Sequence, residues 1–137
     1  MSNNVHIIVA DDDLDDHLLV SRALKDLRQG LVIHSVYDGS ELLNLLKHFD
    51  QGHLEIEKPD CILLDINMPK ITGLMVLNEI KKMEVLFQIP IFVLTTTNSQ
   101  VDFMMASQLG AKACFTKPAD FLQLKKLLAS ILTELSI

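Results

Sequence analysis

Short apolar runs alternate along this chain with longer amphipathic stretches, and this alternation limits the fold more than any other feature. The runs, rich in β-branched residues, are Val5–Ala10, Leu31–Val36, Cys61–Leu64, Ile91–Leu94 and Ala113–Phe115. Runs of this kind are typical of buried strands, and the stretches between them have the spacing of helices. Strands that alternate with helices predict a parallel sheet covered by helices on both faces.

Each run is followed by a stretch whose apolar residues recur three or four positions apart, as on one face of a helix. These stripes are Val20, Ala23, Leu24 and Leu27; Leu42, Leu45, Leu46 and Phe49; Leu74, Leu77 and Ile80; Val101, Met104, Met105 and Leu109; and Phe121, Leu124, Leu128, Ile131 and Leu135. Asp38 and Ser99 mark two helix starts, because an acid follows each of these polar caps three residues later. We interpret Met104 and Met105 as core or partner surface rather than as redox-active residues.

The expected fold is α/β: a doubly wound, five-stranded parallel sheet in the order 2-1-3-4-5, with the connectivity (βα)5. A chain of 137 residues without a linker predicts one domain, residues 1–137. In this strand order the sequence of strands reverses between the first and the third. Ligands in such sheets bind at the carboxyl ends of the strands beside that reversal, just after Ala10 and Leu64.

Composition and charge argue against several functional classes. No apolar run approaches the roughly 18 residues of a membrane span, and the start Met1–Asn4 lacks the features of a secretory signal. We therefore expect a cytoplasmic protein with no membrane contact. The net charge of −6 argues against nonspecific binding of nucleic acid.

Neither the cysteines nor the histidines form a recognisable framework. Cys61 and Cys114 lie inside apolar runs and make no CxxC pair, so buried, reduced thiols are expected. The histidines match no metal-ligand spacing; they are His6, His17, His34, His48 and His53.

Polar residues follow four of the five expected strands. Asp11, Asp12 and Asp13 follow the first, Asp65 and Asn67 the third, Thr95, Thr96 and Thr97 the fourth, and Lys117 and Pro118 the fifth. Because the carboxyl ends of parallel strands meet at one edge, these side chains should converge. Carboxylates, hydroxyls and an ammonium at one point suit Mg²⁺-assisted phosphoryl transfer, with a carboxylate as nucleophile.

Acids gathered in this way are unfavourable without a cation. Two carboxylates about 4 Å apart repel each other by roughly 4 kcal/mol at an effective dielectric near 20. A cluster of Asp11, Asp12 and Asp65 therefore requires a bound cation or a raised pKa.

The same residues carry a family resemblance over essentially the whole chain. The strand that ends in Asp11-Asp12 and the segments Leu63–Pro69, Pro90–Thr95 and Gly110–Pro118 together resemble the response-regulator receiver family. The resemblance implies the flavodoxin-like receiver fold. It also implies a stand-alone receiver of a two-component system that catalyses only its own phosphorylation and dephosphorylation.

The resemblance implies a role for each site residue. Asp65 would be the phosphoacceptor. Asp12, Asp65 and the Asn67 backbone carbonyl would bind Mg²⁺ directly, and Asp11 through water. Thr95 would supply the hydroxyl that moves towards the phosphoryl group, Lys117 would form an ion pair with that group, and the Lys117–Pro118 peptide bond would be cis.

Two features depart from the family pattern. Members usually carry an aromatic residue three positions before the lysine, where this chain has Cys114; Phe115 is one place late and on the opposite face of the strand. This absence puts the aromatic half of the usual switch in doubt. The segment Asp50–Pro59 is also long for the family and has no assigned role.

Three hypotheses follow. In the first, a sensor histidine kinase or a phosphotransfer protein phosphorylates Asp65, and the signal leaves through contact with a downstream protein or through a phosphorelay; the oligomeric state is open. In the second, the chain is an aspartyl-phosphate phosphohydrolase that uses Asp11 and Asp13. In the third, it is a scaffold that works without phosphate.

Asp13, Asp15 and Asp16 can be explained without a catalytic role, because negative charge is favourable at the start of a helix.

Overall fold

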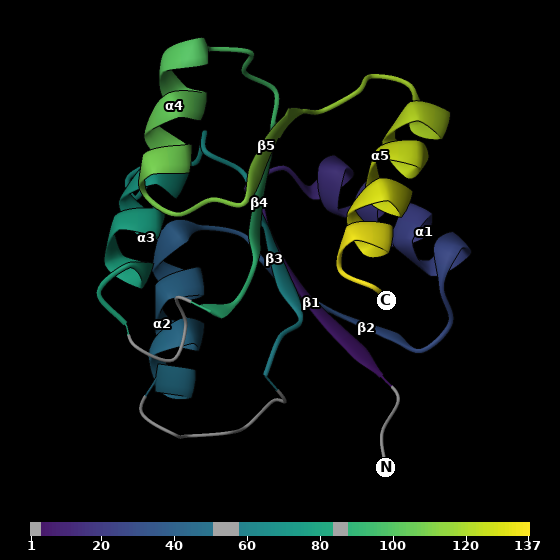
Figure 1. The fold of residues 1–137 in the computed structure, drawn as a ribbon, viewed down its shortest axis with the longest axis horizontal. Coiled ribbons are helices and arrows are strands. Elements are labelled where there is room, and N and C mark those ends of the chain that lie inside the picture. Colours follow the sequence, from purple (N-terminus) through teal and green to yellow (C-terminus); the bar gives the residue numbers. More distant parts are fainter. Residues whose placement is uncertain (1–3, 51–57, 84–87) are drawn as a thin grey trace.

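The structure is a computed structural model that describes residues 4–50, 58–83 and 88–137. Five strands and five helices alternate through these residues (Figure 1). The strands are β1 (Val5–Ala10), β2 (Leu31–Val36), β3 (Cys61–Leu64), β4 (Ile91–Thr95) and β5 (Ala113–Thr116). The helices are α1 (Leu14–Leu27), α2 (Gly39–Asp50), α3 (Gly73–Ile80), α4 (Gln100–Gln108) and α5 (Phe121–Glu134).

The strands form one parallel sheet in the order β2-β1-β3-β4-β5, which confirms the predicted topology. The first three strands have the predicted bounds, while β4 and β5 each run one residue further, to Thr95 and Thr116. In the register of the central pair, Ala10 of β1 lies beside Leu64 of β3. The residues that follow these two positions therefore emerge side by side at the carboxyl edge of the sheet.

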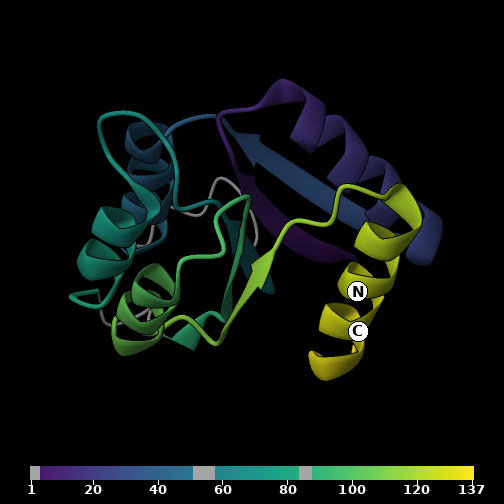
Figure 2. The same cartoon turned by 90° about the horizontal axis from the view of Figure 1, so that it is seen from above.

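Helices cover both faces of the sheet (Figures 1 and 2). The helices α2, α3 and α4 lie over one face, and α1 and α5 lie over the other. Alternate residues of β1 point to opposite faces of the sheet and pack into different layers of the core. Ile8 packs with the α2–α3–α4 layer, whereas Ile7 and Val9 pack with the α1–α5 layer. Every residue of β1 and β3 is buried, and apart from His6 of β1 both strands consist of apolar residues up to the acids that follow them.

Short polar side chains start the helices that follow the sheet edge. Asp13, Thr72, Ser99 and Asp120 accept hydrogen bonds from backbone N–H groups of the first turns of α1, α3, α4 and α5. The Oδ1 atom of Asp38 accepts the N–H of Glu41 at 2.7 Å, so the two predicted helix starts, at Asp38 and Ser99, are confirmed.

Most of the apolar stripe expected for α4 lies outside the core, although Leu109, just after the helix, packs against it. Val101, Met104 and Met105 are 65, 62 and 44% exposed, and Ala106 is the buried residue of this helix. Of the two alternatives for Met104 and Met105, core is therefore wrong, and partner surface stays a prediction. The small side chain of Ala106 lets the backbone of α4 lie close to the core, so the helix packs there without burying its larger apolar side chains.

The remaining expectations concern the cysteines, the long segment and the membrane. Cys61 is buried and Cys114 is half-buried, and both are free thiols. Most of the segment Asp50–Pro59, at positions 51–57, lies outside the described residues. Within the described ranges, no helix has the length and apolar character needed to cross a membrane.

Candidate functional site

Backbone pairing continues one residue past the central strands and places two acids side by side. The N–H of Asp65 donates to the carbonyl of Ala10 at 2.9 Å, and the N–H of Asp11 donates to the carbonyl of Val36 at 3.2 Å. Asp11 and Asp65 are both buried although they are charged residues at the ends of strands. The sheet itself therefore fixes the spacing between these carboxylates.

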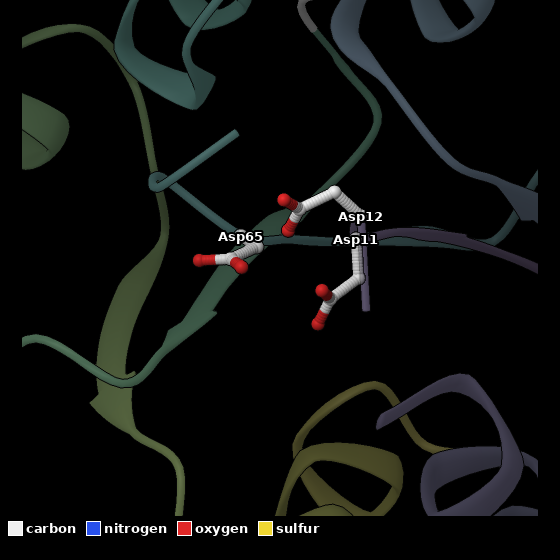
Figure 3. Close-up of side chains that lie close together, drawn as sticks. All are labelled: Asp11, Asp12 and Asp65. Atoms are coloured by element: carbon white, nitrogen blue, oxygen red, sulfur yellow. The ribbon is translucent and has the colours of Figure 1, made fainter. Parts of the chain in front are cut away.

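Three carboxylates meet at this edge (Figure 3). One oxygen each from Asp11, Asp12 and Asp65 lies within 4.8 Å of the other two. Asp12 is exposed while the other two are buried, so the cluster opens to solvent on the side of Asp12. The predicted convergence of these acids is thus present.

In each buried acid, one carboxylate oxygen accepts a backbone hydrogen bond and the other faces the ammonium of Lys117. The Oδ1 atom of Asp11 accepts the N–H of Asp13 at 2.9 Å, and the Oδ1 atom of Asp65 accepts the N–H of Asn67 at 3.1 Å. The Oδ2 atoms of Asp11 and Asp65 both face the ammonium of Lys117. The loops after β1 and β3 therefore fix the rotation of both carboxylates.

Lys117 brings the one positive charge at this cluster in the described part of the chain. Its Nζ atom contacts Oδ2 of Asp11, lies 2.6 Å from Oδ2 of Asp16 and lies 3.5 Å from Oδ2 of Asp65. The N–H of Lys117 donates to the carbonyl of Thr95 at 2.6 Å, which ties the end of β5 to the end of β4. The Lys117 side chain is only 8% exposed, so its charge acts in a poorly hydrated setting.

Burial and charge shift the pKa values of this ion pair. Burial raises the pKa of Asp11 to about 6, against the opposing effect of its hydrogen bonds with Lys117 and Asp13. Burial by itself would lower the pKa of Lys117. Its hydrogen bonds to Asp11 and Asp16 and the charges of Asp65 and Asp11 have a larger, opposite effect, so the pKa of Lys117 rises above its usual value. Lys117 therefore stays charged, while Asp11 is poised to take up a proton in mild acid.

Thr95 and Asn67 complete the edge next to Asp65. Thr95 is fully buried at the end of β4, and its Oγ1 atom accepts the Nδ2–H of Asn67 at 3.4 Å. The structure thus places all the predicted site residues, Asp11, Asp12, Asp65, Asn67, Thr95 and Lys117, at one edge of the sheet. Their individual roles remain predictions.

The oxygen donors fit a hard divalent cation. Mg²⁺ prefers carboxylate, carbonyl and water oxygens, and it usually keeps several waters in protein sites. Three carboxylate oxygens within 4.8 Å of one another, one of them on an exposed residue, provide such donors together with access from solvent. The charge imbalance agrees, because Asp11, Asp12, Asp16 and Asp65 together outnumber the single Lys117.

Two contacts of this site escaped the sequence reasoning. Asp16, interpreted only as a residue that favours a helix start, binds Lys117. His17 is buried, and its Nε2–H donates to the backbone carbonyl of Asp11 at 2.7 Å. Both residues lie on α1 at positions that face the sheet edge. The position of Asp16 in the first turn of the helix that directly follows Asp11 and Asp12 was the available signal for a further acid near the site.

One geometric expectation is wrong. No described residue has a cis peptide bond, so the Lys117–Pro118 bond is trans. The trans form is favoured for a bond before proline by about 0.5–1 kcal/mol, and Lys117 contacts its acids from this form.

The residues of the alternative hydrolase are not arranged as a catalytic pair. Asp13 is the N-cap of α1, where its Oδ1 atom accepts the N–H groups of Asp15 and Asp16 at 2.8 and 3.4 Å. The acid that the phosphohydrolase hypothesis assigns to Asp13 is therefore engaged as a helix cap.

The packing of β5 shows where Cys114 and Phe115 lie relative to the two helix layers. Cys114 packs against the α2–α3–α4 layer, and its Sγ atom lies 3.9 Å from the carbonyl of Phe103 on α4. Phe115 packs into the α1–α5 layer, 6.5 Å from the ring of Phe92. The prediction that Cys114 and Phe115 face opposite sides of β5 is confirmed.

Comparisons with known proteins agree with this arrangement. A family model described as the response regulator receiver domain matches residues 7–129. The phosphorylated cyanobacterial phytochrome response regulator RcpA is 31% identical, with a TM-score of 0.85 over 94% of this chain and 91% of that one. The Mn²⁺-bound form of response regulator Rcp1 is 32% identical, with a TM-score of 0.82 over 94% and 92% of the two chains.

A response regulator receiver domain from Rhodospirillum rubrum is also similar, with 27% identity and a TM-score of 0.83 over 96% of this chain and 94% of that one. The family match runs from the third residue of β1 through most of α5 and includes every residue of the acidic edge. This chain therefore belongs to the response regulator receiver family of two-component systems, whose members are signalling switches controlled by phosphorylation.

Proposed function

We propose that Asp65 accepts a phosphoryl group from a sensor histidine kinase or a phosphotransfer protein, in a reaction that depends on Mg²⁺. The observation that carries this proposal is the position of the Asp65 carboxylate, which is buried next to Asp11 and Asp12, the acids that follow β1, and lies 3.5 Å from the ammonium of Lys117. Residues 1–137 would work as one receiver domain, and the near-complete coverage of RcpA and Rcp1 supports this unit.

Asp65 is suited to act as the nucleophile. Its Oδ1 atom is held by the N–H of Asn67, so the carboxylate has a fixed direction of attack. In the proposed step, an electron pair of a carboxylate oxygen forms the bond to phosphorus. The bond between phosphorus and the histidine nitrogen of the donor breaks, and that nitrogen keeps its electron pair.

The acids would hold the metal ion in the arrangement that the family resemblance implies. Asp12, Asp65 and the backbone carbonyl of Asn67 would be direct ligands, and Asp11 would act through water. When bound, Mg²⁺ would neutralise charge on the phosphoryl oxygens during the transfer. The existence of a Mn²⁺-bound form of the similar protein Rcp1 supports a divalent ion for this chain.

Lys117 and Thr95 would respond to the new charge. Lys117 is already within 3.5 Å of Asp65 and keeps its proton because acids surround it. Thr95 would leave its contact with Asn67 and donate its hydroxyl to a phosphoryl oxygen. The resulting shift at the ends of β4 and β5 would alter the affinity for a downstream protein, or the chain would pass the group on in a phosphorelay.

Phosphorylation by acetyl phosphate tests the proposal without knowledge of the kinase. Wild-type protein incubated with Mg²⁺ should gain one phosphoryl group in intact-mass spectra, and chelation should prevent the gain. Asp65→Asn should remain unmodified, whereas Asp15→Asn, the same change at an exposed acid of α1, should be modified as the wild type is. Full modification of Asp65→Asn would show that another residue is the acceptor.

A further inference from the structure

The lysine of the site is held by an acid that lies outside the acidic triplet. Asp16, in the first turn of α1, places its Oδ2 atom 2.6 Å from Nζ of Lys117. Oδ2 of Asp65 lies further from the same Nζ atom, at 3.5 Å. The ammonium therefore sits closer to α1 than to the proposed phosphoacceptor.

We propose that Asp16 is a positioning residue that holds Lys117 on the α1 side of the site, and that phosphorylation requires Lys117 to exchange Asp16 for a phosphoryl oxygen. The inference rests on the proposed function, because it assumes that the phosphoryl group forms on Asp65. It assigns to Asp16 the control of how readily the lysine reaches that group.

The donor capacity of Lys117 supports an exchange. An ammonium has three N–H donors, and the carboxylates around Lys117 are those of Asp11, Asp16 and Asp65. A phosphoryl group on Asp65 adds acceptor oxygens and negative charge beside this ammonium. Two of the three donors are hydrogen-bonded, to Asp11 and Asp16, while Asp65 is 3.5 Å away, so movement of Nζ towards the new oxygens on Asp65 would lengthen its contact with Asp16 on the α1 side.

The contact with Asp16 is the one that can be released most easily. Asp11 is buried, and its second oxygen is held by the N–H of Asp13. The side chain of Asp16 is 25% exposed, and no hydrogen bond to its second oxygen is found among the described residues. On release, the Asp16 carboxylate would turn towards solvent and regain hydration, which the carboxylate of Asp11 cannot do.

Removal of the Asp16 carboxylate should therefore favour the phosphorylated form. In Asp16→Asn, Lys117 keeps Asp11 as its anchor but loses the competitor on α1. We expect the complex with Mg²⁺ and beryllofluoride, a mimic of the phosphoryl group, to form up to about fivefold more tightly than in the wild type, the upper end of the range for a partly exposed ion pair.

The matched control is Asp15→Asn. Asp15 is the neighbour of Asp16 in the first turn of α1, it is exposed, and its substitution removes the same charge. Any general effect of lower negative charge on the binding of an anion appears in both variants, whereas release of Lys117 appears only in Asp16→Asn. Asp16→Ser is a second variant without the carboxylate, and melting curves check that each variant is folded.

Isothermal titration of beryllofluoride at saturating Mg²⁺ decides the question. The inference is supported if Asp16→Asn and Asp16→Ser bind the mimic more tightly than Asp15→Asn, while all three bind Mg²⁺ alone with similar affinity. It is overturned if the Asp16 variants bind the mimic no better than Asp15→Asn.

A failure of the proposed function would look different. If the wild type does not bind the mimic, or if Asp65→Asn binds it equally well, Asp65 is not the acceptor and both ideas fall. If the wild type binds it and Asp65→Asn does not, the proposed function stands, and equal binding by the Asp15 and Asp16 variants then removes only the role of Asp16.

Discussion

Gly73 packs directly against the main chain of Asp65. A Cβ atom on Gly73 would lie 2.5 Å from the carbonyl oxygen of Asp65 and 2.7 Å from the Cα atom of Ile66. The N–H of Gly73 also donates to the carbonyl of Ile66 at 2.9 Å. The start of α3 therefore supports the loop that carries the proposed phosphoacceptor, and it has no space for a side chain.

Gly73→Ala should both destabilise the protein and impair the site. A methyl group at this position forces the backbone of Asp65 and Ile66 to move, since neither contact atom belongs to a flexible side chain. We expect a loss of about 1–3 kcal/mol in the free energy of unfolding and slower phosphorylation by acetyl phosphate. Denaturant titration and intact-mass time courses measure the two effects.

Gly110→Ala separates the two effects. Gly110 has a φ of +107°, which strains any L residue, but a Cβ atom there would meet nothing within 4 Å. This variant should lose stability while its phosphorylation rate stays close to that of the wild type. A wild-type rate in Gly73→Ala would show that α3 does not support the position of Asp65.

Neutralising one acid should stabilise the metal-free protein. Asp65→Asn removes a charge from three carboxylates that lie within 4.8 Å of one another, and Lys117 keeps its contacts with Asp11 and Asp16. In chelator we expect a gain of about 1 kcal/mol, or about 3 °C in melting temperature, together with a smaller gain from added Mg²⁺. Asp15→Asn should show neither change, and a lower melting temperature of Asp65→Asn in chelator would contradict the expectation.

Much of this arrangement could be predicted, because it follows from local rules. The continuous apolar strands that end at Ala10 and Leu64 determine the sheet, and the parallel register then brings Asp11 and Asp65 together. The capping residue Ser99 was likewise visible from its spacing to an acid. Each of these features depends on neighbours in the sequence or on the handedness of crossovers.

The features that escaped prediction depend on the orientation of a helix against the sheet. Helical spacing shows that Val101 and Met104 share a face with Met105, but it does not show whether that face meets the core, and here it meets solvent. The same uncertainty concealed the contact between Asp16 and Lys117, since it depends on how α1 is rotated about its axis. Packing of the whole layer sets these rotations.

The raised pKa of Asp11 predicts a pH dependence of metal binding. Burial raises this pKa to about 6, so Asp11 carries a proton in metal-free protein below that pH. Mg²⁺ then has to displace the proton, and the dissociation constant should rise by up to about tenfold per pH unit as the pH falls below 6. Titrations of Mg²⁺ between pH 8 and 5 test this, and Asp11→Asn should bind more weakly but without the change near pH 6. Equal affinity at pH 8 and pH 5 would contradict the prediction.

A pair of histidines, His34 on the edge strand β2 and His6 on the neighbouring strand β1, predicts a second pH effect, on stability. Nδ1 of His6 lies 3.0 Å from Nε2 of His34, and burial, with a further contribution from the charge of His6, lowers the pKa of His34 below its usual 6.5. In the unfolded chain His34 takes up its proton at a higher pH than in the folded protein. The stabilisation from neutral His34 is therefore fully present above pH 6.5 and is lost as the pH falls through the folded pKa.

His34→Gln isolates this contribution. Asp11 acts in the opposite direction, because its raised pKa makes its contribution to stability fall as the pH rises towards 6. The difference in unfolding free energy between wild type and His34→Gln cancels the Asp11 effect. That difference should shift in favour of the variant between pH 7.5 and pH 5, as measured by urea titration at each pH, and a constant difference would contradict the assignment.

The lifetime of the phosphorylated state depends on what can orient a water molecule opposite the breaking bond. The side chains expected beside that line are those two residues beyond Asp65 and Thr95, namely Asn67 and Thr97. In the structure the amide of Asn67 donates to Thr95, and the Oγ1 atom of Thr97 accepts the N–H of Ser99 at 3.2 Å. Thr97 is also short and uncharged, so one of the two water-orienting groups is absent.

We therefore expect phosphorylated Asp65 to persist longer than in receivers that carry an acid or amide at the position of Thr97. Thr97→Glu should accelerate hydrolysis, because a carboxylate at this position can orient the attacking water, by no more than the roughly hundredfold range of one positioned group. Thr96→Glu adds the same charge at the adjacent exposed residue and should leave the rate unchanged. The measurement is the decay of the phosphorylated protein by intact mass after removal of the donor. Equal or slower decay in Thr97→Glu would show that residue 97 does not border the attacking water, whereas acceleration in both variants would assign the effect to charge alone.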